Sequence, residues 1–459
     1  MAGIGFELEK ILQRESYTSM LHAYSYAIIV STGPWLFSII AILLVVLLAK
    51  ISKTNAEVII QFKTLVVYMI SASLIISSIF QYTFSRFIAD SMYDKKTEQI
   101  KPNFYGACLT LTIFSLLLSI CLIIIFLPDV DIVTRGLTLA TLVTLSLVWL
   151  CTISLSGAKV YKQITISFFL GYSIICVGAY FLRQHGLNQL MACFLVGQVV
   201  LLLLLILTMR YHYPSKLWLG FAFLRGTKAM PWLIASGVFY NLGLWIDKYL
   251  FWFHSQTSTP VIGLLNLSYI YDTPIFISTL TSIFSIAFFF LFIETSFVKS
   301  YKNLFDQICY GGTLAKIRGI HNELIQRTRD LLLGVIKIQV IISTLCFFLG
   351  SIFLKLLHID PFYIYILNIL VLALGLSVMY WVLLEVLFYL NKYRYCTFIC
   401  ALFFFSNLIF TNISIKLGVF FYGYGIALSL LVTTIAAFLL INRAYKKLEY
   451  AVFAFSTDG

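Results

Sequence analysis

The chain has 459 residues, of which 61% are hydrophobic and only 11% are charged, and its formal net charge is +13. About a quarter of the residues in a water-soluble domain are charged, so this composition excludes a soluble globular protein and indicates a multi-spanning membrane protein. Twelve candidate spans follow one another along the chain. They cover residues 24–49, 62–87, 104–127, 136–157, 164–182, 189–209, 232–253, 267–293, 331–354, 362–390, 396–415 and 418–441.

The basic residues select one orientation of these spans. With the N-terminus in the cytoplasm, about 24 of the 32 Lys and Arg lie in or beside cytoplasmic segments, as the positive-inside rule requires. An even number of spans then also places the C-terminus in the cytoplasm. Membrane topology therefore accounts for most of the basic charge, and we expect the lipid bilayer rather than a nucleic acid as the partner of this charge.

The order of the spans predicts an all-α integral membrane protein with two six-helix lobes. Residues 1–210 form the N-terminal lobe, residues 211–231 a cytoplasmic lobe linker, and residues 232–459 the C-terminal lobe, which includes a cytoplasmic loop at 294–330. The linker is polar and contains Pro214, Arg225, Lys228 and Pro231. Paired bundles of this kind are typical of transporters.

The first span is interrupted by the sequence Ser31-Thr32-Gly33-Pro34. Pro34 removes a backbone hydrogen bond to the carbonyl of Val30, and hydrocarbon offers no water in its place. One interpretation is a proline kink satisfied by the Ser31 or Thr32 hydroxyl and a neighbouring helix. The other is a hinge or cavity wall, formed by Gly33 and Pro34, in an alternating-access transporter.

Spans seven and eight carry polar and helix-disrupting residues. These are Tyr240, Asn241, Asp247 and Lys248 in span seven, and Asp272 and Pro274 in span eight. A charge at mid-bilayer costs about 2.5 to 3.5 kcal/mol or more, so each needs a partner, water or a role. Lys248 could extend outward while Asp247 pairs with it or with span eight. Alternatively, Asp247 and Asp272 line a wet cavity between the lobes and bind sugar hydroxyls or a proton.

Spans two and ten carry further polar stripes. In span two, Gln81 and Arg86 lie on adjacent helical rows, and in span ten Trp381 and Glu385 share one row at i and i+4. An aromatic ring beside a carboxylate suits carbohydrate, whose ring faces stack while its hydroxyls bond to the acid. Plain helix packing with an acid extending to the cytoplasmic end is the alternative.

The loop at 294–330 shows helical spacing of apolar residues from Thr313 onward, which predicts a cytoplasmic amphipathic helix broken by Gly319. Its basic residues include Lys316, Arg318, Arg327 and Arg329. The helix lies on anionic lipid or docks a cytosolic partner.

The motifs of common enzymes are missing from the sequence. It contains neither GxxxxGK[ST] nor HExxH, and its six His and nine Cys show no metal-ligand spacing. Asp129 and Asp131 follow Pro128 in a short external loop, where a turn explains them. We therefore expect no enzyme, no metal and no cofactor.

Several segments resemble the PelG family of inner-membrane Pel exopolysaccharide transporters. They are MAGIGFELEKIL, GVFYNLGLWIDKYLFWF, YDTPIF, FIETSFVKSYKNLFDQI and GGTLAKI. The resemblance implies a bacterial inner-membrane exporter, related to polysaccharide flippases and multidrug exporters, that moves a hexosamine-rich polymer for the biofilm matrix. It also implies as partners a cytosolic Pel glycosyltransferase and Pel membrane subunits that include a cyclic-di-GMP receptor.

Two rival functions are compatible with the same residues. The chain could flip a lipid-linked oligosaccharide or export a small molecule in exchange for a cation. It could also serve as a membrane scaffold that anchors the glycosyltransferase while polymer passes elsewhere.

Overall fold

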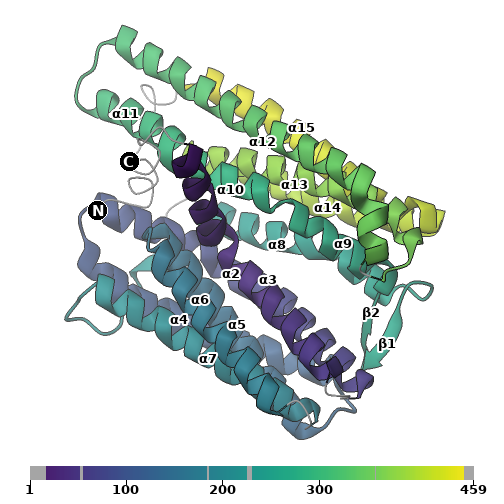
Figure 1. Cartoon of the computed structure of the whole chain (residues 1–459). Coiled ribbons are helices and arrows are strands. Elements are labelled where there is room, and N and C mark those ends of the chain that lie inside the picture. Colours follow the sequence, from purple (N-terminus) through teal and green to yellow (C-terminus); the bar gives the residue numbers. More distant parts are fainter. Residues whose placement is uncertain (1–16, 52–54, 183–185, 225–229, 357, 449–459) are drawn as a thin grey trace. The chain divides into compact units, whose positions relative to one another are not determined.

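The computed structural model describes residues 17–51, 55–182, 186–224, 230–356 and 358–448 of the chain, and this part is nearly all helical (Figure 1). Each of the twelve predicted spans coincides with one helix or with consecutive helices. The long helices are α2 (Tyr17–Ile51), α3 (Ala56–Tyr93), α4 (Ile100–Phe126), α5 (Ile132–Gly157), α6 (Tyr161–Leu182), α7 (Leu187–His212), α8 (Met230–Phe253), α9 (Tyr269–Thr281), α10 (Ile283–Phe292), α11 (Val298–Cys309), α12 (Leu314–Leu356), α13 (Ile364–Tyr389), α14 (Tyr393–Leu417) and α15 (Tyr424–Lys446).

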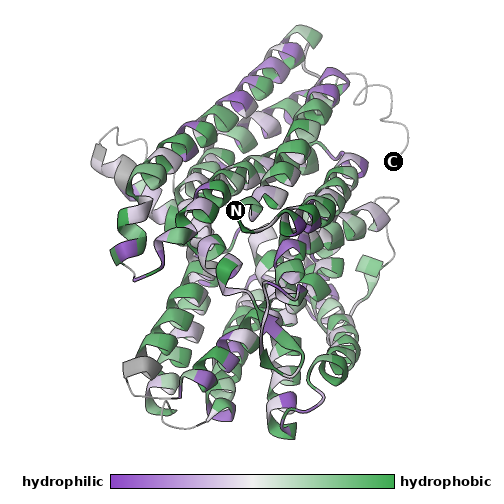
Figure 2. Cartoon of the chain, turned by 90° about the vertical axis from the view of Figure 1, so that its right-hand side faces the viewer, coloured by the Kyte–Doolittle hydropathy of each residue, from purple (hydrophilic) through white to green (hydrophobic). Residues whose placement is uncertain are grey.

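Ten helical segments in the described part are long and apolar enough to cross a membrane, and the bent helix α2 raises the number to eleven. Apolar residues cover most of the helical length, and hydrophilic residues gather toward the helix ends (Figure 2). Helix α8 coincides with the seventh predicted span but is not in this set, because its Asn, Asp, Lys, Trp and Tyr residues lower its mean hydropathy. The protein is thus a multi-pass membrane protein; twelve spans and cytoplasmic termini stay predictions, since residues 1–16 and 449–459 lie outside the described part.

Helix α2 bends by 67° between His22–Pro34 and Leu36–Leu47, at the interruption noted in the sequence. Immediately before Pro34, the Ser31 hydroxyl donates a 2.6 Å hydrogen bond to the carbonyl of Ala27, and the Thr32 hydroxyl donates a 2.7 Å bond to the carbonyl of Ile28. Proline has no N–H and clashes with the preceding turn, so a bend is the expected result.

The chain divides into two compact units, residues 33–269 and residues 1–32 with 270–459. In the first, α3 packs on α4, α5 and α8, while α7 packs on α5 and α6. In the second, α13 packs on α12, α14 and α15. Helix α8, which begins the predicted C-terminal lobe, therefore packs with residues 33–269. The lobe boundary at 211–231 stays a prediction, and Arg225 and Lys228 of the linker lie outside the described residues.

The described part of the linker packs on the start of α4. The backbone N–H of Gly220 donates to the carbonyl of Pro102 at 2.9 Å, and Asn103 accepts a bond from the N–H of Phe223 at 3.2 Å. The side chain of Lys101 donates to the carbonyl of Ser215 at 2.7 Å. These bonds hold residues 215–223 against the start of α4 within the first unit.

A short β-hairpin lies between α8 and α9, in the stretch that separates the seventh and eighth predicted spans. Strands β1 (Thr259–Ile262) and β2 (Leu265–Leu267) pair antiparallel, with Thr259 opposite Leu267 and Ile262 opposite Leu265. Gly263 follows β1 with φ +55°, a backbone conformation that glycine adopts without strain. The Tyr68 hydroxyl of α3 donates to the carbonyl of Asn266 at 2.9 Å and fixes the hairpin to the first unit.

The predicted break at Gly319 is wrong, because α12 runs without interruption from Leu314 to Leu356. Glycine costs a helix only about 1 kcal/mol relative to alanine, and the buried neighbours Ile317 and Ile320 stabilise the helix on both sides. The predicted amphipathic segment and the ninth span are thus one helix, which α11 joins in a hairpin (Figure 1).

Candidate functional site

A close contact between α3 and α8 forms the polar centre of the first unit. Gly237 makes it possible, because a Cβ atom there would lie only 2.5 Å from the backbone oxygen of Ser78. Farther along the same contact, the hydroxyls of Ser71 and Tyr249 are 2.8 Å apart, and the rings of Tyr68 and Trp252 lie 4.5 Å apart. This contact, from Gly237 to Trp252 of α8 with Tyr68 to Tyr82 of α3, is called the α3–α8 seam below.

The Asp247 side chain is fully buried in this unit. Both of its carboxylate oxygens accept from the ammonium of Lys248 at 3.3 Å. Lys248 also donates to the carbonyl of Leu244 at 2.9 Å and lies 5.5 Å from the centre of the Trp245 ring. The pairing of Asp247 with Lys248 is one of the arrangements considered from the sequence. In this conformation the carboxylate does not face open space, so a position on a wet cavity stays a prediction.

Other predicted residues of the first unit lie near the seam or pair locally. Buried Asn241 donates to the carbonyl of Gly237 at 3.0 Å, and buried Gln81 donates to the Ser77 hydroxyl at 2.8 Å. Half-buried Tyr240 lies one residue before Asn241. Arg86 instead pairs with Asp90 one turn later, at 2.9 Å, and both side chains are more than a third exposed.

Asp272 and Pro274 belong to the second unit, in the first turns of α9. Asp272 is half-buried, and Pro274 lies inside the helix. Acidic residues are stabilised in a first turn by the free N–H groups of the helix. Asp247 and Asp272 are therefore not brought together within one compact unit.

Trp381 and Glu385 lie in a second polar cluster, around the π-helix at Ile293–Phe297. Trp381 donates a side-chain hydrogen bond to Glu385, and its ring lies 4.9 Å from the ring of Phe289. Tyr389 interacts electrostatically with Glu385 of its own helix and with Glu294 of the π-helix. Isolated π-helical turns occur frequently at functional sites, because the extra residue changes the direction of a side chain.

Sequence reasoning missed Glu294 and the aromatic residue Tyr301, whose ring lies 5.5 Å from that of Tyr389. Glu294 was counted as the start of a loop, since nothing in the sequence marks a π-helix. The signal available was the period from Phe297 through Tyr301 to Phe305, which places three rings on one helical face.

The basic residues of the α11–α12 hairpin have different surroundings. Lys316 and Arg318 are exposed. Arg327 lies 3.7 Å from Glu323, which also accepts a 2.9 Å hydrogen bond from Ser300 of α11. Arg329 is exposed and borders an apolar groove that residues of α12, α13 and α15 line.

The comparison with protein families decides what kind of protein this is. The model of the PelG exopolysaccharide exporter family matches residues 1–453. The chain belongs to the PelG exopolysaccharide exporter family. No curated protein matches the chain.

Solved structures confirm the fold that is expected of a PelG family member. A MATE protein in a bent conformation has a TM-score of 0.60 at 12% identity, covering 95% of this chain and 97% of that chain. An outward-facing multidrug resistance MATE transporter of the MOP superfamily has a TM-score of 0.61 at 14% identity, covering 92% and 96%. A MOP superfamily transporter from Pyrococcus furiosus has a TM-score of 0.59 at 13% identity, covering 93% and 95%. The fold is therefore MATE-like, and the family and these structures are those of transporters.

Proposed function

We propose that the chain exports a Pel-type, hexosamine-rich exopolysaccharide across the bacterial inner membrane and so supplies the biofilm matrix. The family match over residues 1–453 supports this proposal most strongly. The MATE-like fold supports a two-lobe exporter that works by alternating access or as a channel. Helices carry the chain through lipid, whereas polar side chains inside them provide the contacts for saccharide.

The proposed cycle uses the seam and the bend of α2. Asp247 is buried beside Lys248 in this structure, so transport requires a second conformation in which α8 exposes the carboxylate to saccharide. Gly33 and Pro34 act as the hinge in α2, because neither residue supports a straight helix. Asp272 at the start of α9 provides a second polar contact in the other unit, and Pro274 follows it inside the helix.

The partner of the transport process is a cytosolic glycosyltransferase that binds the α11–α12 hairpin. Exposed Lys316 and Arg318 give this surface a positive charge away from the apolar part of α12. The other Pel membrane subunits, including a cyclic-di-GMP receptor, regulate export in this proposal.

The deciding experiment deletes the gene from a Pel-producing bacterium while the glycosyltransferase is retained. Polymer is then measured in the cytoplasm and outside the cell. Cytoplasmic accumulation is expected, because synthesis continues and export stops. Loss of all synthesis would contradict export and favour the scaffold function.

The cluster around Glu385 favours a cation-coupled exporter or lipid-linked oligosaccharide flippase as the second candidate function. Two carboxylates beside one tyrosine, Glu294 and Glu385 around Tyr389, are groups that bind a cation or a proton. This candidate predicts transport in purified proteoliposomes that contain no glycosyltransferase. A dependence on an imposed ion gradient would support it over export driven by polymer growth.

A further inference from the structure

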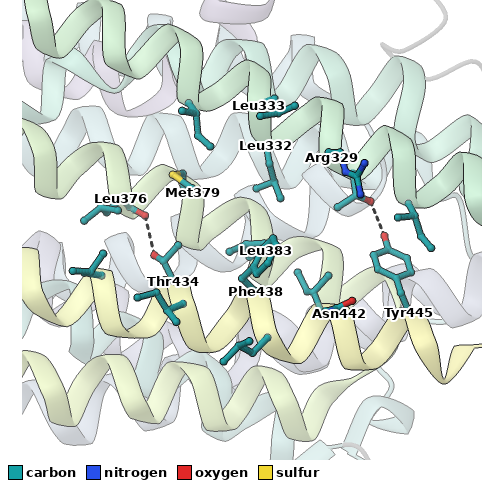
Figure 3. A pocket seen from close by; sticks show the side chains of 17 residues that line it. Arg329, Leu332, Leu333, Leu376, Met379, Leu383, Thr434, Phe438, Asn442 and Tyr445 are labelled. Atoms are coloured by element: carbon teal, nitrogen blue, oxygen red, sulfur yellow. Dashed lines mark hydrogen bonds between the residues drawn. The ribbon is translucent and has the colours of Figure 1, made fainter.

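An apolar groove with one basic end lies on the second unit, apart from the residues assigned to export (Figure 3). Its volume is about 700 Å³, within the range of roughly 300 to 1,000 Å³ of small-molecule sites. Helix α13 forms its floor with Leu376, Met379 and Leu383, while α12 and α15 form its two walls. Both walls pack on α13, which holds them apart.

The walls present apolar side chains to the open side of the groove. Leu333, Ile435, Phe438 and Leu439 are all more than two-fifths exposed. The polar atoms between the walls are already paired. The hydroxyls of Thr328 and Tyr445 are 2.6 Å apart and join α12 to α15, and Thr434 donates to the carbonyl of Leu376 at 3.5 Å. The occupant of the middle of the groove is therefore apolar.

The charge is confined to one end. Arg329 and Asn442 are exposed where the groove reaches the point at which Thr328 of α12 is bonded to Tyr445 near the end of α15 (Figure 3). Within the part of the chain that the structure describes, neither side chain has a hydrogen-bond or ion-pair partner. This end lies beside the last turn of α15, on the predicted cytoplasmic side. A basic pocket between helices at that surface is suited to an anionic lipid headgroup.

The length of the groove matches one leaflet. Leu431 and Asn442 are eleven residues apart on α15, which corresponds to about 16 Å at 1.5 Å per residue. Half of the hydrocarbon core of a bilayer is about 15 Å thick. An acyl chain that starts at Arg329 would thus run along the groove to the middle of the membrane.

We propose that this groove binds one anionic phospholipid, with its phosphate at Arg329 and Asn442 and one acyl chain between α12 and α15. An ordinary lipid-facing surface would hold neutral and anionic lipids equally. The arginine of the groove makes it selective: its guanidinium donates to the phosphate of either lipid, but the choline ammonium of a zwitterionic lipid cancels the net charge and is repelled by the arginine, whereas an anionic lipid keeps its full attraction.

The test titrates the full-length protein in detergent with palmitoyl-oleoyl phosphatidylglycerol or with the phosphatidylcholine of the same chains, and counts bound lipids by native mass spectrometry. We expect tighter retention of phosphatidylglycerol. Arg329→Gln should weaken its binding about tenfold and leave phosphatidylcholine unchanged. Arg443→Gln, which alters an exposed arginine of α15 outside the groove, should have no effect, and Arg329→Lys should retain part of the preference.

A second pair of variants tests the apolar part. Ile435→Trp fills the groove and should reduce retention of both lipids, whereas Leu428→Trp, on an exposed face of α15 outside the groove, should not. Equal retention of the two lipids by the wild type, or equal effects of Arg329→Gln and Arg443→Gln, would overturn the proposal. If Ile435→Trp leaves the retention of both lipids unchanged, the proposal is likewise overturned, and the groove has another occupant, such as a helix of a partner subunit.

Discussion

The ammonium of Lys248 lies 3.3 Å from both carboxylate oxygens of Asp247, although the two residues are adjacent in α8. Neighbouring residues in a helix point about 100° apart. Lys248 therefore folds back over Leu244, and the charged pair stays beside the α3–α8 seam rather than in lipid.

Removal of one member of this pair should be more harmful than removal of both. Lys248→Met leaves a buried carboxylate without its counter-ion and should lower the free energy of unfolding by about 3 to 5 kcal/mol. Asp247→Asn with Lys248→Met should recover much of that stability. Thermal unfolding in detergent measures the stability, and polymer outside the cell measures export. If the double variant is stable and still exports, Asp247 has no role in transport.

The seam itself can be tested at Gly237. Alanine there would bring a Cβ to 2.5 Å from the Ser78 oxygen, so Gly237→Ala should force α8 away from α3 and cost about 1 to 3 kcal/mol. Gly136→Ala in α5 is the matched control, since no atom lies within 4 Å of its Cβ position. That control should stabilise the protein by about 0.5 to 1 kcal/mol. Equal melting temperatures for the two variants would contradict the close approach.

Pro34→Ala should straighten α2, because alanine restores the N–H that can bond to the carbonyl of Val30. Spin labels at Ile29 and Leu43, both about half exposed, report the bend in a background that lacks the exposed Cys121 and Cys309. Their separation should lengthen toward roughly 21 Å, the length of fourteen helical residues. Export should fall while the amount of protein in the membrane is unchanged. If the Pro34→Ala variant has a straight α2 and still exports polymer normally, the bend in α2 is not a hinge of the transport cycle.

Charge reversal at Lys316 and Arg318 should abolish co-purification with the glycosyltransferase, because both side chains are exposed and give this surface its positive charge. Arg210→Glu, at the exposed end of α7, is the control for a general change in surface charge. Arg327 should matter less, since it pairs with Glu323 at 3.7 Å and such half-exposed pairs contribute about 0.2 to 1 kcal/mol. Unchanged co-purification would leave contact with anionic lipid as the role of these residues.

Glu385→Gln tests the cation-coupled alternative. Glutamine keeps the size of the side chain and its contact with Trp381 but removes the charge. Transport into proteoliposomes should lose its dependence on an ion gradient, whereas Arg86→Gln, which changes an exposed ion pair in the other unit, should retain it. A gradient dependence that survives in both variants would exclude Glu385 as the coupling group.

The helices could be predicted from the sequence, because hydropathy and length determine which segments can lie in a membrane. Proline and glycine likewise located the bend in α2. Long-range packing was less accessible. The contact of α8 with α3 depends on Gly237 and Ser78, which are far apart in the chain, and no local pattern of residues marks it.

Local rules also failed where neighbouring structure outweighs intrinsic preference. Gly319 was predicted to break a helix, yet buried Ile317 and Ile320 keep α12 intact across it. The β-hairpin at Thr259–Leu267 is stabilised by the bond from Tyr68 in α3, and the π-helix at Ile293–Phe297 leaves no pattern in composition. The polar residues of the site were recognisable, whereas their partners were not.

The uninterrupted helix α12 has a mechanical consequence. Its 43 residues correspond to a rod about 65 Å long, roughly twice the thickness of the hydrocarbon core. If the end of α12 that carries Lys316 and Arg318 is tilted about the middle of the helix, the end at Leu356 moves in the opposite direction. If a glycosyltransferase binds this end of α12, a movement of the enzyme during polymer addition would therefore also move the part of α12 that lies in the membrane.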